Sequence, residues 1–354
     1  MAQDFHGDSR VDDFKQMLDK MYNRLKALMP RSSQLVAVSR KLPGTEEGLE
    51  RWEARQLSRG IERVWHIMRL LRLLTEYFGD KLFFGGGSIL NYVYMVKFNE
   101  PPRLTFDLDS TWYRKVSSKR VILKEMVGFN RWLAENDLTL QIPLSWDRTA
   151  ELFIVEYDRD KDFFPELLSL RMPVITRYDG ETFHEFLGMQ DYDIIMRLRK
   201  VFKEVLGVKN PRIDYVRFEI SLEPKGMPRE KVMLEDIFGS RTQAWITRLE
   251  YQLASKIAYK VAKDYGSDLG YNLRDILKAA LDLRLLKGMN AKAVKRYAGP
   301  INIETVKRNL EALKSPIGRK LWDNNYHYIL ARRRYTLEDL TKQVKKLIMS
   351  STLD

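Results

Sequence analysis

Apolar residues recur with the spacing of a helix in several parts of this chain. The predicted helices cover residues 11–29, 60–78, 119–136 and 191–206, and the helical pattern resumes at residue 245. Short apolar runs or strict alternation predict strands around Phe83 and over residues 138–144, 151–157 and 213–222. Strands in the middle of the chain and helices at its end indicate an α+β protein.

The segment between Phe83 and Ser110 carries the most informative chemistry. Its strand runs into Gly-Gly-Gly-Ser at residues 85–88, which opens into a stretch with helical pattern. Glycines at a strand-to-helix turn let a backbone approach a triphosphate closely, and the helix start offers free N–H groups. The turn is therefore a candidate phosphate cradle.

Two carboxylates follow on the next predicted strand. Asp107 and Asp109 alternate with Phe106 and Leu108, so both acids point to one face while the apolar residues point to the core. Mg²⁺ prefers to share its oxygen ligands between carboxylates, water and phosphate groups. An acidic pair or a run of glycines alone is more often a solvated turn or a loop, but their order here favours phosphoryl or nucleotidyl transfer.

The combined motif resembles that of a known enzyme superfamily. The pattern G-G-S-x-L followed by R-x-T-x-D-x-D is similar to the polymerase-β-like nucleotidyltransferases, most closely the AbiEii/MenT-like branch of toxins from toxin–antitoxin and abortive-infection systems. The matching positions are Gly86, Gly87, Ser88, Leu90, Arg103, Thr105, Asp107 and Asp109. Eighteen residues separate Ser88 from Asp107, several more than usual, and we place the extra length at residues 95–102.

The resemblance implies a third carboxylate from a later strand. Glu219 is the candidate, because Val216, Phe218 and Ile220 alternate with it and leave it on the opposite face of its strand. The family more often has Asp at this place, and Glu156 is the alternative. With Asp107 and Asp109, this acid would hold the metal.

Two further positions match motifs of the family. Lys256 lies in a segment that resembles its lysine helix, and Asp275 in Arg274-Asp275 resembles its R-D motif. The resemblance implies that Lys256 neutralises charge as pyrophosphate leaves and that Asp275 orients nearby groups. It also implies that Gly86, Gly87, Ser88, Arg103 and Lys256 bind the nucleotide. The second acid of the R-D motif is replaced by Lys278, and a solvated lysine with a helix-capping aspartate is the structural alternative.

Composition restricts the classes of site and partner. The chain has no cysteine and four scattered histidines, so a metal would have oxygen ligands. No apolar run approaches the roughly 18–20 residues of a membrane span, and the first residues lack the apolar core of a signal peptide, so we expect a cytoplasmic protein without membrane contact. Residues 240–354 contain 23 Lys and Arg against 11 Asp and Glu, almost the whole net charge of +13.

This charge asymmetry predicts a polyanionic partner, although lysine-rich helices also serve solubility alone. Aromatic residues such as Tyr297 and Trp322 lie among the basic ones, and they suit either stacking on unpaired bases or a helical core. The predicted helix over residues 11–29 either packs on the body or binds a partner.

These observations lead to one expected organisation. It comprises a helical extension at 1–58, a polymerase-β-like nucleotidyltransferase domain with a mixed sheet at 59–238, and a mostly helical basic domain at 239–354. The expected activity is Mg²⁺-dependent transfer of NMP from an NTP to a nucleic-acid 3′ end, most plausibly of tRNA, by a toxin with a possible antitoxin partner. The alternatives are a catalytically silent nucleic-acid-binding module and an enzyme that modifies a hydroxyl of a protein or small molecule.

Overall fold

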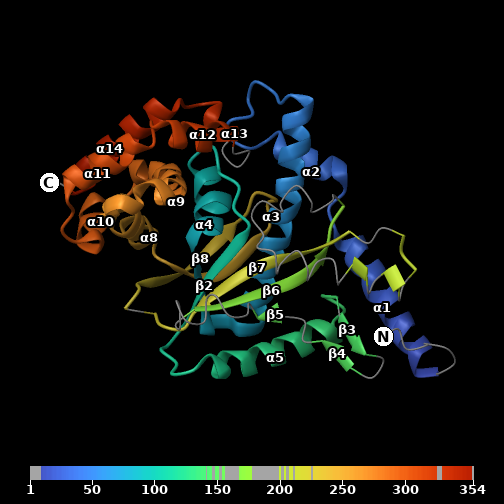
Figure 1. The fold of residues 1–354 in the computed structure, drawn as a ribbon. Helices are drawn as coiled ribbons and strands as arrows, with labels where there is room; N and C mark the ends of the chain where they lie inside the picture. Colours follow the sequence, from blue (N-terminus) through green and yellow to red (C-terminus); the bar gives the residue numbers. More distant parts are fainter. Residues whose placement is uncertain are drawn as a thin grey trace. The chain divides into compact units, whose positions relative to one another are not determined.

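The computed structural model describes residues 9–352 except 141, 146–147, 151–153, 156–166, 178–198, 201–202, 205–206, 210–211, 225 and 325–328 (Figure 1). The chain divides into two compact units, and each is assembled from two separate segments. The first unit combines Met1–Gln34 with Arg114–Glu223, and the second combines Leu35–Tyr113 with Pro224–Asp354. Neither unit is continuous in sequence, and the linear division at residues 58 and 238 stays a prediction.

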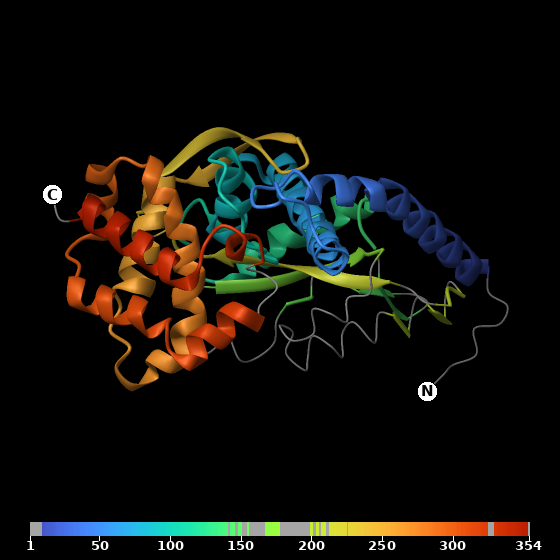
Figure 2. The same cartoon turned by 90° about the horizontal axis from the view of Figure 1, so that it is seen from above.

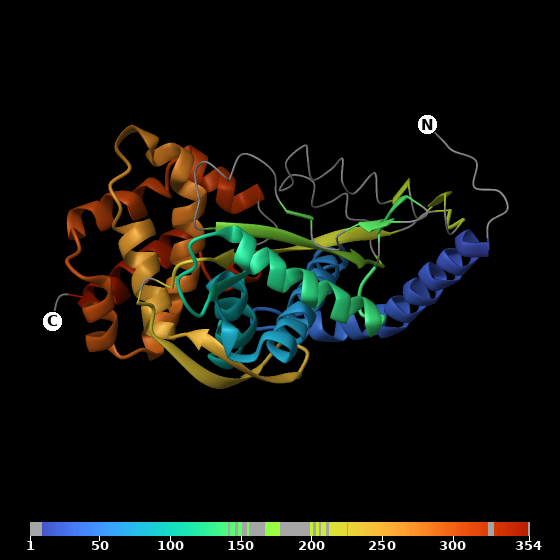
Figure 3. The same ribbon diagram turned by 90° about the horizontal axis from the view of Figure 1, so that it is seen from below.

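The first unit holds an antiparallel arrangement of strands and two long helices. Its helices are α1 (Ser9–Leu28) and α5 (Lys119–Glu135). Its strands are β3 (Ile142–Ser145), β4 (Arg148–Ala150), β5 (Ile154–Val155), β6 (Leu167–Ile175) and β7 (Ile213–Ser221). Strand β6 pairs with both β5 and β7, and β3 pairs with β4. Figure 3 shows α5 lying across the two longest strands.

The predicted elements of this unit form for the expected local reasons. In α5, Ile122, Met126, Phe129 and Leu133 are buried at helical spacing, and the Ser118 side chain accepts a hydrogen bond from the Arg120 N–H as an N-cap. In β7 from Val216 to Ser221, apolar residues are buried while the alternate polar ones are partly exposed. The helices predicted over 11–29 and 119–136 and the strand over 213–222 are confirmed. The helix predicted over 191–206 lies mostly outside the described residues.

The second unit contains four strands in the order β2-β1-β9-β8. They are β1 (Leu82–Gly85), β2 (Asp107–Trp112), β8 (Arg229–Glu235) and β9 (Arg241–Thr247). Strand β1 is antiparallel to β2 and parallel to β9, whereas β8 and β9 form an antiparallel pair. The expected mixed sheet is therefore present.

Helix α3 (Arg51–Phe78) leads into β1. It follows α2 (Ser32–Ser39) and begins nine residues before the predicted start at residue 60, because Glu50 and Glu53 form a reciprocal capping box. Gly79, with φ of 57°, ends it as expected and is followed by a single 3₁₀ turn, Gly79–Lys81. Strand β1 then enters α4 (Gly86–Ile89), which continues as a π-helical segment, Leu90–Met95.

The start of the C-terminal helical part differs from the prediction. Residue 245 lies within β9 and not in a helix, and the first helix begins at Leu249. Ala244 and Ile246 are buried at strand spacing, because β9 pairs with β1 on one side and with β8 on the other. Tertiary pairing thus overrides the weak helical pattern there.

The remaining helices pack around one apolar core, visible as the orange and red part of the chain in Figure 2. They are α8 (Leu249–Lys256), α9 (Leu269–Asp282), α10 (Ala291–Ala298), α11 (Ile303–Ala312), α12 (Pro316–Asn324), α13 (Ile329–Arg332) and α14 (Leu337–Thr352), with π or 3₁₀ segments at Ile257–Val261, Gly266–Asp268 and Leu283–Gly288. Trp322 is buried in this core and Tyr297 packs against it, so both rings serve packing. No described helix is both long and apolar enough to cross a membrane.

Candidate active site

The glycine turn after β1 lies directly against one of the two acids. Gly85 is paired in register with Asp109 across β1 and β2, and the Gly87 N–H donates a hydrogen bond to Asp109 Oδ2 over 3.3 Å. Gly86 has φ of +69°, and a Cβ at this position would lie 1.6 Å from Asp109 Oδ2. Only glycine leaves room for this close approach.

The second acid, Asp107, is fixed by a neighbour just before its strand and by one on α4. Thr105 Oγ1 donates a 2.6 Å hydrogen bond to Asp107 Oδ1, and the buried Ser88 hydroxyl donates to the Asp107 carbonyl oxygen. In the structure Ser88 therefore ties the turn to the acidic strand, while its role as a phosphate ligand stays a prediction. Thr105 thus holds the Asp107 carboxylate, and Ser88 holds the Asp107 backbone.

Asp107 and Asp109 share the half-buried face of β2, and Leu108 between them is completely buried. Phe106, which we expected in the core, is only half-buried and lies under the Arg63 guanidinium, 5.1 Å from its carbon. The two carboxylates and the close-fitting Gly86 suit a Mg²⁺ ion that takes its other ligands from water and phosphate. Among the described residues, no group of three or more His, Cys, Asp or Glu side chains is placed to hold a metal.

A buried charge cluster lies beneath the glycine turn. Asp282, the last residue of α9, accepts hydrogen bonds from Arg103 Nε and Nη2, each 2.9 Å long. Lys256 Nζ lies 2.9 Å from Asp282 Oδ2, and Asn91 Nδ2 donates a hydrogen bond of 2.9 Å to Asp282 Oδ1. The Asp282 side chain is completely buried, so this carboxylate has its full set of partners away from water.

The electrostatics of this cluster favour the ionised acid. Burial raises the pKa of Asp282, but Arg103 and Lys256 together with the hydrogen bonds from Arg103 and Asn91 outweigh burial and hold that pKa well below its usual range. Arg103 is itself 5% exposed and directs two of its nitrogens to this carboxylate. The structure thus gives Arg103 a positioning contact, and direct binding of nucleotide by Arg103 stays a prediction.

The segment Leu90–Met95 connects the cluster to the turn and the acids. Asn91 Nδ2 also donates to the Gly87 carbonyl, and Asn91 Oδ1 accepts the Arg103 N–H. The Tyr92 hydroxyl is within 2.6 Å of both the N–H and the carbonyl oxygen of Thr105. Two adjacent side chains therefore set the path of the chain that leads into Asp107.

The predicted partner Asp275 takes a different place. Its carboxylate pairs with Lys260 over 3.0 Å and remains 44% exposed, whereas Lys256 binds Asp282. Asp282 is thus a site residue that the sequence reasoning missed. A signal existed, since it is a lone acid within the apolar run Ala279-Ala280-Leu281-Asp282-Leu283. Whether Asp275 acts in a reaction stays a prediction.

Lys278 lies within electrostatic reach of Asp107. It is half-buried and has no ion-pair partner among the described residues. Burial lowers its pKa, and the charges of Arg103 and Arg274 lower it further, while Asp107 and Asp275 act in the opposite direction. A partly desolvated cation whose charge interacts with that of Asp107 is suited to an anionic ligand.

The remaining predicted acids belong to the first unit. Glu219 lies on the partly exposed face of β7 as expected and pairs with Arg217 over 2.5 Å. Its role as the third metal ligand stays a prediction. The alternative, Glu156, lies outside the described residues.

Comparison with known proteins finds distant structural likeness. No family model and no curated protein matches the sequence. Among solved structures, the chain is similar to MenT4, a nucleotidyltransferase toxin from Mycobacterium tuberculosis H37Rv, with 13% identity and a TM-score of 0.42 over 91% of this chain and 99% of that one. A likeness this distant carries no argument about activity.

Proposed function

We propose that this protein is a Mg²⁺-dependent nucleotidyltransferase that transfers NMP from an NTP to a nucleic-acid 3′ end. The observation that carries the proposal is the contact of the Gly85–Gly87 turn with Asp109, which places a backbone turn free of side chains beside two carboxylates on one strand face. Such a turn accommodates phosphates and such a pair accommodates Mg²⁺.

Each residue has a defined task in this proposal. Asp107 and Asp109 would hold Mg²⁺, which when bound neutralises triphosphate charge and favours ionisation of the attacking hydroxyl. Glu219 would complete the acidic set. Lys278 and Lys256 offset negative charge as pyrophosphate departs, with Lys256 held by Asp282. Most of the rate enhancement would come from positioning and charge neutralisation.

The proposed class of acceptor is inferred from the positive charge of the C-terminal region. The surplus of basic residues in 240–354 favours a polyanion over a small molecule, and the motif resemblance favours a tRNA 3′ end and a growth-arresting toxin with an antitoxin partner. Of the two alternatives, a silent binding module predicts no product, and a transferase for protein or small-molecule hydroxyls predicts a labelled protein or small molecule.

One experiment separates these functions. Purified protein is incubated with each α-³²P-labelled NTP, Mg²⁺ and total RNA, beside the Asp107→Ala/Asp109→Ala double variant, and the products are resolved on a denaturing gel. We expect label in a tRNA-sized band with the wild type alone, and none after chelation of Mg²⁺. Absence of label under every NTP, with RNA still retarded on a native gel, would favour the binding module. Label confined to protein or small molecules would favour the third function.

A further inference from the structure

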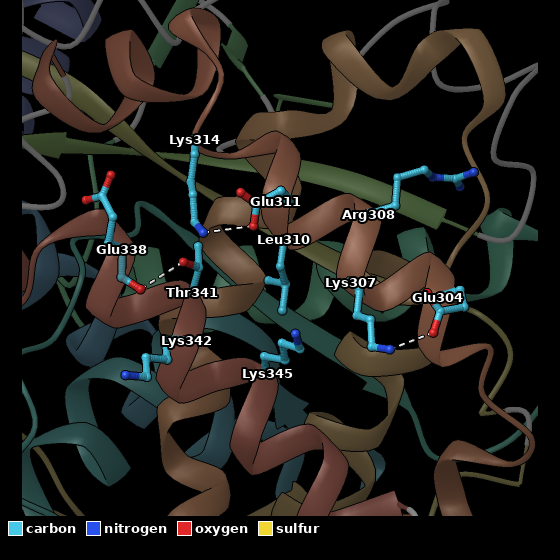
Figure 4. Close-up of a pocket in the computed structure, with 10 residues that line it drawn as sticks. All are labelled: Glu304, Lys307, Arg308, Leu310, Glu311, Lys314, Glu338, Thr341, Lys342 and Lys345. Carbon is cyan, nitrogen blue, oxygen red and sulfur yellow. Dashed lines mark hydrogen bonds and ion pairs between the residues drawn. The ribbon is translucent and has the colours of Figure 1, made fainter.

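A groove on the C-terminal helices lies between α11 and α14 and has a volume of about 570 Å³. Its walls carry polar and charged side chains almost throughout (Figure 4). The lining residues are Glu304, Lys307, Arg308, Leu310, Glu311, Lys314, Glu338, Thr341, Lys342 and Lys345. None of them belongs to the site around Asp107.

The acids that line the groove are already paired. Glu304 binds Lys307 over 2.6 Å and Glu311 binds Lys314 over 2.8 Å, each within one turn of α11 or its C-terminal extension. On the opposite wall Glu338 binds Arg319 over 2.5 Å. The three acids therefore neutralise Lys307, Lys314 and Arg319. In the described part of the chain they form no ion pair with Lys342 or Lys345.

Two lysines on α14 remain uncompensated. Lys342 and Lys345 lie one turn apart and have no ion-pair partner among the described residues, and Lys345 is half-buried. Their separation of three residues corresponds to about 4.5 Å along the helix. Like charges this close repel each other, so an anion between them would be favourable.

The other conspicuous basic motif of this region is used inside the unit. Arg333 pairs with Glu53 over 2.9 Å and donates to the Gly48 carbonyl, while Arg334 binds Glu46 and the Asn99 carbonyl. These arginines thus hold loops in place. Lys342 and Lys345 differ from these two arginines, because they have no such partner among the described residues.

We propose that the groove between α11 and α14 binds the phosphate backbone of the nucleic-acid acceptor, with Lys342 and Lys345 as the phosphate ligands. This inference rests on the proposed function and names the second surface that such an acceptor would use. Each wall extends over eight residues, from Glu304 to Glu311 and from Glu338 to Lys345, or about 10 Å along the helix, which is longer than a single phosphate. Together with the positive surplus of the region, this length favours a nucleic-acid strand over a free phosphate ion.

The test compares Lys342→Gln/Lys345→Gln with Lys292→Gln/Lys295→Gln. The control pair has the same spacing on α10 and lies outside the groove lining. Binding of bulk tRNA and of a single-stranded RNA oligonucleotide is measured without NTP at several salt concentrations. For single strands each phosphate contact contributes a log–log slope of about −0.7, so loss of two contacts should weaken binding about 25-fold at 0.1 M salt and reduce the slope by about 1.4.

The outcomes are separable from those of the transfer assay. The proposal would be overturned if the groove variant bound RNA with the same affinity and salt slope as the control variant, whether or not both were weaker than the wild type. Selective loss in the groove pair, with retention in Lys342→Arg/Lys345→Arg and unchanged thermal unfolding, would support it even if no NTP were turned over. If the Lys342→Gln/Lys345→Gln variant binds RNA as the wild type does but no longer binds an acidic protein that the wild type binds, the surface serves a protein partner and the proposal is wrong.

Discussion

Arg103 and Asp282 meet through two hydrogen bonds of 2.9 Å each, although 179 positions separate them along the chain. Both side chains are almost or completely buried. The pair joins the segment before the acidic strand to the last turn of α9, and Asn91 extends the connection to the glycine turn. The geometry around Asp107 therefore depends on an ion pair that does not itself need to touch substrate.

We expect Asp282→Asn to destabilise the protein by roughly 3–5 kcal/mol, because Arg103 and Lys256 would lose the buried carboxylate that both of them contact. Urea unfolding measures the change. Asp275→Asn is the matched control, since its pair with Lys260 is about half exposed and should contribute less than about 1 kcal/mol. Equal losses in the two variants would contradict the buried-cluster account.

The free energy of unfolding should also depend on pH through Asp282. The pKa of Asp282 is lower in the folded than in the unfolded protein, so its contribution is complete above the unfolded value and is lost as the pH falls toward the folded value. Between pH 5 and pH 2, the free energy of unfolding should therefore fall more for the wild type than for Asp282→Asn. Parallel curves for the two proteins would show that another group controls the acid dependence.

Gly86→Ala should slow transfer by about 10²-fold while leaving the fold intact. The new Cβ would displace the Asp109 carboxylate, and a shift of this kind costs on the order of 10²-fold in rate. Gly239→Ala is the control, because Gly239 also has positive φ, +76°, but meets no atom within 4 Å. Comparable transfer rates for these two variants would refute the proposed role of the turn.

Lys278→Ala should reduce kcat by about 10²-fold, because a half-buried cation within electrostatic reach of Asp107 would no longer offset charge on the triphosphate. Stability should hardly change, since the lysine has no ion pair in the described part of the chain to lose. Lys260→Ala removes a lysine of the same neighbourhood that is paired with Asp275, and it should leave kcat within a few-fold. Steady-state kinetics with saturating RNA tests both, and equal effects would argue against a special role for Lys278.

Local patterns in the sequence determined the elements that carry the site. The two-residue period of β2 places Asp107 and Asp109 on one face, and the glycines between β1 and α4 permit a turn that other residues cannot adopt. The amphipathic period likewise predicted α1, α5 and most of α3. These features depend on neighbours a few positions apart, so the sequence alone reveals them.

Only the tertiary structure decided which side chains contact one another. The periodicity of α9 marks Asp282 as an acid among apolar residues, but only packing selects Arg103 and Lys256 to neutralise it. Packing also made Trp245 part of a strand and assigned Arg333 and Arg334 to internal contacts. A sequence period specifies which face a side chain occupies, whereas the partner on that face comes from residues far away in the chain, because burial brings them together only after folding.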